Sequence, residues 1–223
     1  MPITYDISLP TGAPVEVFAP WPRAQREVDW LAREPVPPAP LLRSRGLLAP
    51  DLAERIADWF LAPSEVSEAV VRASYAALQH ETEHLWQVIR RGLRVRVRYD
   101  RGADDPYGAR DLCAELRDRG SMRLRTIACD DPHPLLDSTE GGIVDRLRVV
   151  HDVFGHAALG VGFDLQAEYA TWLQCRALFS DAARPAAFCE LVAPVTTRVV
   201  TGERPALRAD LPPAELLAAC QAI

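Results

Sequence analysis

Apolar residues recur at helical spacing in several stretches of the chain. The longest stretch follows Ser64, and its mostly apolar positions alternate at spacings of four and three residues: Val71, Tyr75, Leu78, Thr82, Leu85 and Ile89. This spacing places them on one face of a helix. Ser64 suits the N-cap because its hydroxyl can accept a hydrogen bond from a free backbone N–H group of the first turn. The pattern predicts a helix over residues 64–91 that ends at Gly92.

Other stretches predict shorter helices and a small sheet. Helical periods or caps occur in residues 23–33, 50–61, 104–120, 141–156, 164–180 and 185–193, and from Pro213 onward. Apolar residues alternate with arginines in residues 93–99, and the same alternation begins residues 122–129. Both stretches are therefore predicted to be strands. His133, in DDPHP, is interpreted as a turn residue. The expected fold class is α+β, predominantly helical, with a sheet of two or three strands.

Proline marks the main boundary along the chain. The EPVPPAP segment at residues 34–40 cannot continue a helix and should form an extended, semi-rigid strap. We therefore expect residues 1–48 to form an N-terminal extension that carries this strap, and residues 49–223 to form a single helical domain. A chain of 223 residues, of which 48% are hydrophobic, is long enough to bury a core of this kind.

Charge and cysteine content narrow the functional class. The formal net charge is -6, which argues against a nucleic-acid surface, and every basic residue apart from histidine is arginine. The five cysteines form no CxxC pair, a pattern typical of buried thiols in a reducing compartment. The first residues lack a signal-peptide pattern, and no apolar run is long enough for a membrane span. We therefore expect a cytoplasmic protein with no membrane or nucleic-acid partner.

Residues 151–156 read HDVFGH and place two histidines five residues apart near the end of a predicted helix. Imidazoles are common ligands of transition metals. On a regular α-helix, side chains five residues apart point about 140° away from each other. One wider, π-helical turn would bring His151 and His156 to the same side, and the backbone can yield most easily at Gly155. The alternative is one surface histidine and one half-buried histidine that share no ligand.

Two glutamates could complete a metal site with these histidines. Glu168 falls at the edge of the apolar face of the predicted 164–180 helix, where a carboxylate is costly unless it is neutral, paired or bound to a cation. Glu190 falls roughly opposite the apolar residues of a shorter helix. Burial therefore favours Glu168 as the ligand. The alternative for Glu168 is an ion pair with Arg176 or another arginine.

The HDVFGH segment resembles the iron-binding motif of the aromatic amino acid hydroxylases, H-[DE]-x-x-G-H, in which two histidines bind non-heme iron. His151, Asp152, Gly155 and His156 all match this motif. The third ligand in that family is a glutamate in a V/I-E-F/L context, and Glu190 in FCEL is the position similar to it. The resemblance implies that His151, His156 and Glu190 form a facial triad around Fe(II). We could match no pterin-contacting segment upstream.

The same stretch is similar to uncharacterised bacterial and phage-encoded proteins that share an HDxFGH motif followed by G-E-x-x-A-like and E-T-like segments. That pattern implies roles for both Glu168 in AEYA and Glu190 in CELV, although alanine replaces the glycine before Glu168. The candidate metal ligands are therefore His151, His156, Glu190 and Glu168. Glu168 and Asp152 are the candidate catalytic residues.

A second histidine pair lies in HETEH, residues 80–84, which formally fits the H-E-x-x-H motif of zinc peptidases. His80, Glu83 and His84 fall opposite the apolar stripe of their helix, so they should face solvent and form no zinc site. Glu81 lies beside the stripe. It could accept a hydrogen bond from a ligand imidazole, bind a second metal, or pair with an arginine of RVRVR.

These observations predict a metal-binding domain at 49–223 that works as a non-heme iron(II)-dependent oxygenase on a small molecule, such as an aromatic amino acid or a related metabolite. Its partners would be that molecule and O2. Electrons would come from a reduced pterin, a 2-oxo acid, a second iron or the substrate, and a dinuclear centre would use Glu81, Glu168 and Glu190 with both histidines. The alternatives are a zinc-dependent hydrolase with the same His/Glu site and a non-catalytic interaction module.

Overall fold

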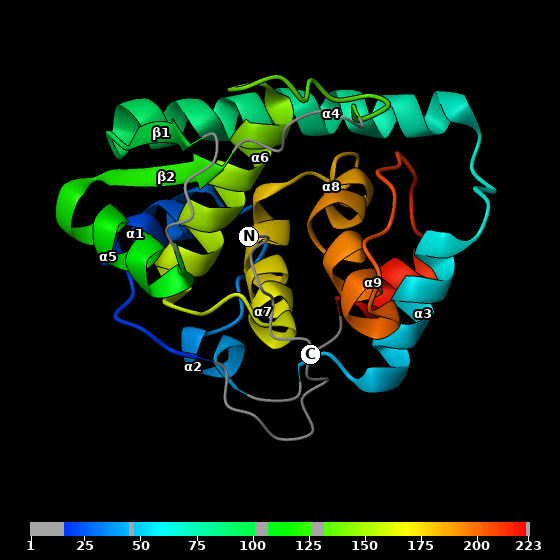
Figure 1. Ribbon diagram of the computed structural model, residues 1–223, viewed down its shortest axis with the longest axis horizontal. Helices are drawn as coiled ribbons and strands as arrows, with labels where there is room; N and C mark the ends of the chain where they lie inside the picture. The colour runs from blue at the N-terminus through cyan, green and yellow to red at the C-terminus, as the bar shows by residue number, and fades with distance from the viewer. Residues whose placement is uncertain (1–15, 45–46, 101–106, 126–131, 222–223) are drawn as a thin grey trace.

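The computed structural model describes residues 16–44, 47–100, 107–125 and 132–221, and this part of the chain is predominantly helical (Figure 1). The α-helices are α1 (Pro22–Leu31), α2 (Ala39–Leu42), α3 (Pro50–Leu61), α4 (Glu68–Gln87), α5 (Ala109–Arg119), α6 (Ile143–His151), α7 (Leu165–Cys175), α8 (Arg184–Leu191), α9 (Ala193–Thr201) and α10 (Ala214–Ala219). The π-helical turns are η1 (Val88–Gly92) and η2 (Asp152–Ala157), a 3-10 turn is η3 (Arg176–Leu178), and the strands are β1 (Arg96–Asp100) and β2 (Ser121–Arg125). The predicted α+β class is confirmed.

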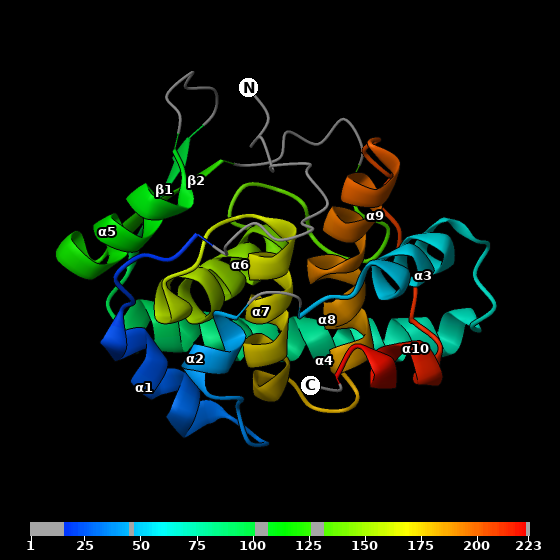
Figure 2. The same ribbon diagram turned by 90° about the horizontal axis from the view of Figure 1, so that it is seen from below.

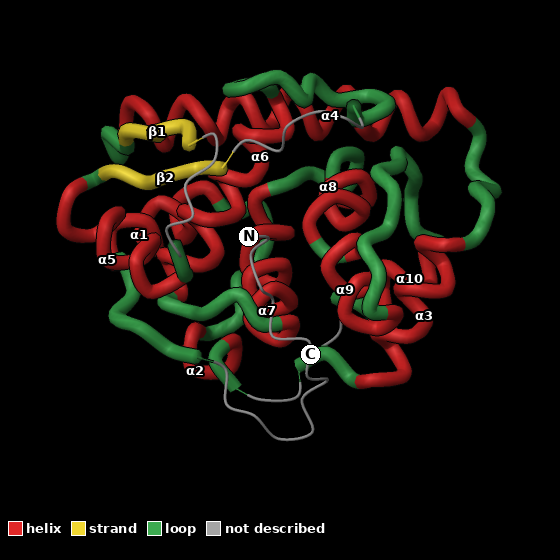
Figure 3. Tube along the Cα trace, in the orientation of Figure 1, coloured by secondary structure: helices red, strands yellow, loops and turns green. Residues whose placement is uncertain are grey.

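The elements are arranged around α7 and along α4. Helix α4 runs along one side of the molecule, with the sheet and α5 towards one of its ends and α3 and α9 towards the other (Figure 1 and Figure 2). The tube in Figure 3 shows the same helices surrounding α7, with loops over the outside. All residues of α7 are buried. The sequence predicted one apolar face for this helix, but its central position surrounds it with other helices on every side.

Two glutamine side chains of α7 are buried and hydrogen-bond to neighbouring segments. The side-chain amide of Gln166 donates to the carbonyl of Leu48 at 2.9 Å and accepts from its N–H at 3.0 Å. The Gln174 amide donates to the carbonyl of Phe154 at 2.5 Å. These hydrogen bonds remove most of the cost of placing amides in the core, and they tie α7 to segments on both sides of it.

The sheet consists of β1 and β2, which pair in parallel with Arg96 opposite Ser121 and Asp100 opposite Arg125. A parallel pair needs a crossover, and α5 supplies it. Gly120 ends α5 with a φ of 57°, a left-handed conformation that favours glycine, and the chain enters β2 directly. The predicted strand 122–129 and the predicted helix 104–120 each continue into residues outside the described ranges.

Helix α4 begins four residues later than the sequence predicted. Helix α4 begins at Glu68 after Ser67, so Ser64 lies ahead of it and does not cap it; the hydroxyl of Ser64 donates to the Asp210 carboxylate at 2.7 Å. The far end of the predicted helix is the π-helical turn η1, which the apolar spacing did not indicate.

Helix α9 was not predicted. The sequence predicted a helix over residues 185–193 and the next one from Pro213. Pro194 sits within the first turn of α9, where its missing N–H would have no helical partner. Helix α9 contains several β-branched residues, which have modest helix propensity. Packing of α9 against α3 stabilises it instead.

The described part of residues 1–48 packs against the helices of the remaining chain. Val17 pairs with Val161 in an isolated antiparallel bridge, and the N–H of Trp21 donates to the carbonyl of Ala157 at 2.7 Å. Ala24 and Val28 of α1 are buried in the common core. Among the described residues, no helix combines the length and apolar character that crossing a membrane requires. The four described cysteines are free and buried, and Cys129 lies outside the described residues.

Candidate metal centre

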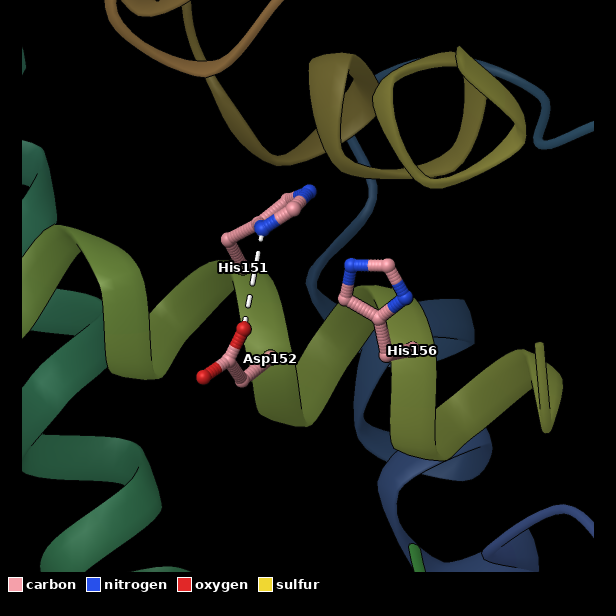
Figure 4. A group of neighbouring side chains, drawn as sticks. All are labelled: His151, Asp152 and His156. Carbon is pink, nitrogen blue, oxygen red and sulfur yellow. Dashed lines mark ion pairs between the residues drawn. The ribbon is translucent and has the colours of Figure 1, made fainter. Parts of the chain in front are cut away.

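The two histidines of HDVFGH meet because the helix widens between them. His151 is the last residue of α6, and His156 lies in the π-helical turn η2 that continues it. Their rings approach edge to face, with centroids 4.8 Å apart. Figure 4 shows both imidazoles on the same side of the helix. The π-helical turn predicted from the five-residue spacing is confirmed.

Gly155 allows η2 to lie directly against α7. A Cβ atom at this position would lie 2.7 Å from Cβ of Thr171 and 3.0 Å from its Cγ2 atom, and real Cβ atoms do not approach so closely. Thr171 follows Glu168 by three residues, so both side chains lie on neighbouring faces of α7. The close contact of the two helices therefore brings Glu168 to the histidines.

The Glu168 carboxylate faces both imidazoles. Its Oε2 atom lies 3.4 Å from Nε2 of His151, and its Oε1 atom lies 3.4 Å from Nε2 of His156. Glu168 is only 4% exposed, and His156 is fully buried. Two imidazole nitrogens and one carboxylate thus converge in a site removed from bulk water. The sequence favoured Glu168 because its position was predicted to be buried, and the structure buries it beside both histidines.

Asp152 lies on the other side of the His151 ring. Its Oδ1 atom is 3.7 Å from Nδ1 of His151, the contact drawn as a dashed line in Figure 4. His151, Asp152 and His156 form a group whose ligand atoms all lie within 4.8 Å of one another, close enough to hold a metal ion. Glu168 approaches the Nε2 atoms of both rings, whereas Asp152 faces Nδ1 of one ring. Glu168 is therefore the carboxylate better placed to share one ion with both histidines.

The environment of His156 is unusual for a buried imidazole. Neither of its ring nitrogens has a hydrogen-bond partner, and the 3.4 Å separation from Glu168 is an ion-pair distance. Burial by itself lowers the pKa of His156, but the adjacent Glu168 carboxylate outweighs it, so the pKa is raised above its ordinary value. A buried imidazole without hydrogen bonds beside a carboxylate is costly unless a proton or a cation lies between them.

Two thiols and one aromatic ring complete the surroundings. The Cys113 thiol donates to the backbone carbonyl of His156 at 3.6 Å. Burial and the nearby Asp152 carboxylate raise the pKa of Cys113 to about 12, and burial also raises the pKa of Cys175. Both thiols therefore stay protonated, and the thiolate is the form that binds metals. The Phe163 ring packs edge to face on His156, with centroids 4.7 Å apart.

Glu190 does not lie with the histidines, contrary to what the family resemblance implied. Its Oε1 atom accepts a hydrogen bond from the Tyr75 hydroxyl at 2.5 Å and is 3.0 Å from Nε2 of His133. Nδ1 of His133 accepts from two backbone N–H groups, so Nε2 carries the proton that His133 donates to Glu190. Within the described residues, Glu190 makes no ion pair with His151 or His156. Because Tyr75 and His133 already donate hydrogen bonds to it, this carboxylate needs no metal.

His133 is therefore more than the turn residue that its sequence context suggested. Its ring is buried and stacks on Tyr75, with centroids 5.6 Å apart. Local sequence could not reveal this role because the partners of His133 come from α4 and α8, far along the chain in both directions.

The other candidate carboxylate and the second histidine pair also lie elsewhere. Glu81 accepts a hydrogen bond from the Ser180 N–H at 2.9 Å and lies 3.7 Å from the Arg33 guanidinium. Its arginine partner therefore comes from the segment after α1 and not from the RVRVR segment. His80 and His84 are exposed, in agreement with the apolar stripe of α4. The HETEH segment accordingly forms no buried centre. Of the three carboxylates considered for a dinuclear centre, Glu168 lies beside His151 and His156, whereas Glu81 and Glu190 pair with other residues.

Thr171 is the residue of the site that the sequence did not indicate. Its hydroxyl oxygen lies 2.6 Å from Nε2 of His151. Nothing in the sequence pattern relates residue 155 to residue 171, and their contact depends on the packing of η2 against α7.

Comparisons with protein-family models, with curated proteins and with solved structures gave no match.

Proposed function

We propose that the protein is a non-heme iron(II)-dependent oxygenase that acts on a small molecule, with one iron ion held by His151, His156 and Glu168. The observation that carries this proposal is the position of the Glu168 carboxylate, whose two oxygens lie 3.4 Å from the Nε2 atoms of the two imidazoles. Two histidines and one carboxylate are the donor set of the facial-triad oxygenases, which leaves further positions at the metal open.

The residues of the centre suit a divalent transition metal. Imidazole nitrogens bind iron and zinc, the carboxylate supplies charge, and the protonated thiols nearby leave the donor set free of sulfur. The partnerless ring nitrogens of fully buried His156 add an independent reason to expect a cation. When bound, iron would supply the electron-transfer chemistry that O2 requires and that no side chain of this site offers.

The side chains around the centre would admit the substrate, orient the His151 ring and shield His156 from water. Buried His156 and Glu168 form the floor of the site, while the side chain of Asp152 is 19% exposed, so a small molecule would approach from the Asp152 side. Asp152 would orient the His151 ring by accepting a hydrogen bond from its Nδ1 atom after a small shift. The Phe163 ring would keep water from His156.

One iron ion per chain fits the carboxylates better than two. Glu81 and Glu190 already have partners outside the centre, so neither is available as a bridge between two metals. The electrons for the reaction would then come from the substrate or from a second small molecule, such as a reduced pterin or a 2-oxo acid. An aromatic amino acid is the first substrate to test, because the HDVFGH motif resembles that of the aromatic amino acid hydroxylases.

Elemental analysis tests the proposal most directly. Protein purified without a metal-affinity tag and exposed to Fe(II) under anaerobic conditions should retain about one iron per chain, the number of complete donor sets in the site. It should consume O2 when an aromatic amino acid and a reduced pterin are added. Retention of zinc instead would favour a hydrolase with the same ligands. Binding of neither metal would contradict the proposal and leave a non-catalytic interaction module.

Substitutions locate the metal within the chain. His156→Ala and Glu168→Gln should each lose iron, because each removes one of three ligands. His84→Ala is the matched control, since His84 is also a helical histidine but is exposed on α4. It should retain wild-type iron content. Loss of iron in the His84 variant, or full loading in the His156 variant, would rule out the proposed ligand set.

A further inference from the structure

Thr171 contacts two of the three proposed ligands, His151 and Glu168, without being a ligand itself. Its Oγ1 atom lies 2.6 Å from Nε2 of His151 and donates to the backbone carbonyl of Glu168 at 2.7 Å. Its Cβ and methyl group fill the space beside Gly155. The side chain is fully buried, so no water competes for these contacts.

Counting protons defines the state of His151. A threonine hydroxyl has one proton, and Thr171 donates it to the Glu168 carbonyl. The short contact with His151 must then be a hydrogen bond from the Nε2–H group to the threonine oxygen. Nε2 of His151 therefore carries a proton in this structure and has no lone pair for a metal. The other ring nitrogen, Nδ1, faces Asp152 at 3.7 Å.

We propose that Thr171 is a positioning residue that takes the place of the metal at His151 when the site is metal-free. This inference rests on the proposed metal site. Metal binding through Nε2 would break the hydrogen bond to Thr171, and the single N–H proton of the neutral ring would then lie at Nδ1 instead of Nε2. From Nδ1, this N–H group can donate a hydrogen bond to the Asp152 carboxylate.

Two consequences follow from this exchange. The metal-free site stays ordered, because His151 is held in place by Thr171 rather than left as an unpaired buried group. Metal affinity is lowered by the free energy of the lost hydrogen bond, so metal is held less tightly than the same ligands would hold it alone. A residue that only packed between helices would have the opposite effect, because its removal would loosen the site and weaken binding.

The test is whether removing the Thr171 hydroxyl strengthens or weakens metal binding. Thr171→Val keeps the shape of the side chain and removes the hydroxyl, and Co²⁺ binding can be followed anaerobically by visible absorption. We expect the variant to bind Co²⁺ roughly three- to tenfold more tightly than wild type, the range for one net hydrogen bond. Thr171→Ser keeps the hydroxyl and should stay within about twofold of wild type. Metal-free Thr171→Val should also melt at a lower temperature, with a smaller difference once Co²⁺ is bound.

Thr196→Val is the matched control. Thr196 is also fully buried, its hydroxyl has no hydrogen-bond partner, and it lies on α9, so its substitution should leave Co²⁺ affinity unchanged. If Thr171→Val does not fold, Thr171→Ala removes the same hydroxyl and must show the same tightening. Unchanged or weaker Co²⁺ binding by the hydroxyl-free variant would overturn the inference while leaving the metal site in place. A wild-type protein that binds no Co²⁺ would overturn both.

Discussion

At residue 155, the absence of a side chain sets the distance between two helices. Any Cβ there would meet Cβ of Thr171, an atom attached directly to the α7 backbone and unable to rotate away. The same contact positions Glu168 and Thr171 against His151. The close approach of η2 to α7 therefore requires glycine at this position.

Gly155→Ala should consequently destabilise the protein. Overpacking of this kind costs about 1–3 kcal/mol of unfolding free energy, because the helices must separate to admit the methyl group. Chemical denaturation of the metal-free protein measures this change, and metal affinity should fall with it as Glu168 moves away from the histidines. Gly92→Ala is the control, since its Cβ would lie 3.6 Å from the nearest side-chain atom, an ordinary contact. Equal stability of the two variants would contradict the close approach.

At the scale of elements, the Glu190 carboxylate joins three segments of the chain. Tyr75 comes from α4, Glu190 from α8, and His133 from the loop before α6. Both donors converge on one oxygen of the carboxylate. Burial and the Glu190 charge raise the pKa of Tyr75, so its hydroxyl keeps its proton and acts as a donor. The group is a structural link between helices and not part of the metal site.

Glu190→Gln should therefore weaken the fold but keep the metal. The amide oxygen can still accept from both donors, but without the negative charge both hydrogen bonds are weaker, which lowers the free energy of unfolding by about 1–3 kcal/mol. Iron content should remain at the wild-type level, in contrast to Glu168→Gln. Parallel measurement of denaturation and metal content separates the two roles. Loss of iron in the Glu190 variant together with retention in the Glu168 variant would return the ligand role to Glu190.

At the scale of the whole molecule, the chain before α3 is fastened to the far end of α7. The Glu34 carboxylate lies 2.9 Å from the Arg176 guanidinium and 3.2 Å from that of Arg184. The neighbouring Arg33 N–H donates to the carbonyl of Ala177 at 2.8 Å. The predicted strap is thus anchored by charge at its first residue, and the helix before it, α1, packs into the core.

Glu34→Gln should release this attachment. Both arginines are largely buried while Glu34 is 28% exposed in its side chain, so the loss should be about 1–2 kcal/mol, between the values for surface and buried pairs. Faster trypsin cleavage near the strap and a lower denaturation midpoint should accompany it. The exposed pair Glu68–Arg72 offers a control, because Glu68→Gln should cost about 0.5 kcal/mol or less. Identical cleavage rates for both variants would show that Glu34 does not secure the strap.

The sequence by itself determined the features that depend on near neighbours. Apolar spacing located most helices, and the outward direction of His80 and His84 followed from the same stripe. The five-residue separation of His151 and His156, with glycine between them, predicted the π-helical turn, because hydrogen bonding within a helix involves residues only a few positions apart. Burial estimated on a helical wheel favoured Glu168 over Glu190 for the same local reason.

Only the tertiary structure decided which distant residues meet. Helix α4 begins at Glu68, so Ser64 does not cap it, and the Ser64 hydroxyl bonds to Asp210, 146 residues away. Glu190 is bound by His133 across 57 residues, whereas Glu168 reaches the histidines because Gly155 lets α7 approach η2. Helix α9 exists through its packing on α3. Such choices depend on the free energy of packing and on pairing between segments, and no pattern within a single segment contains that information.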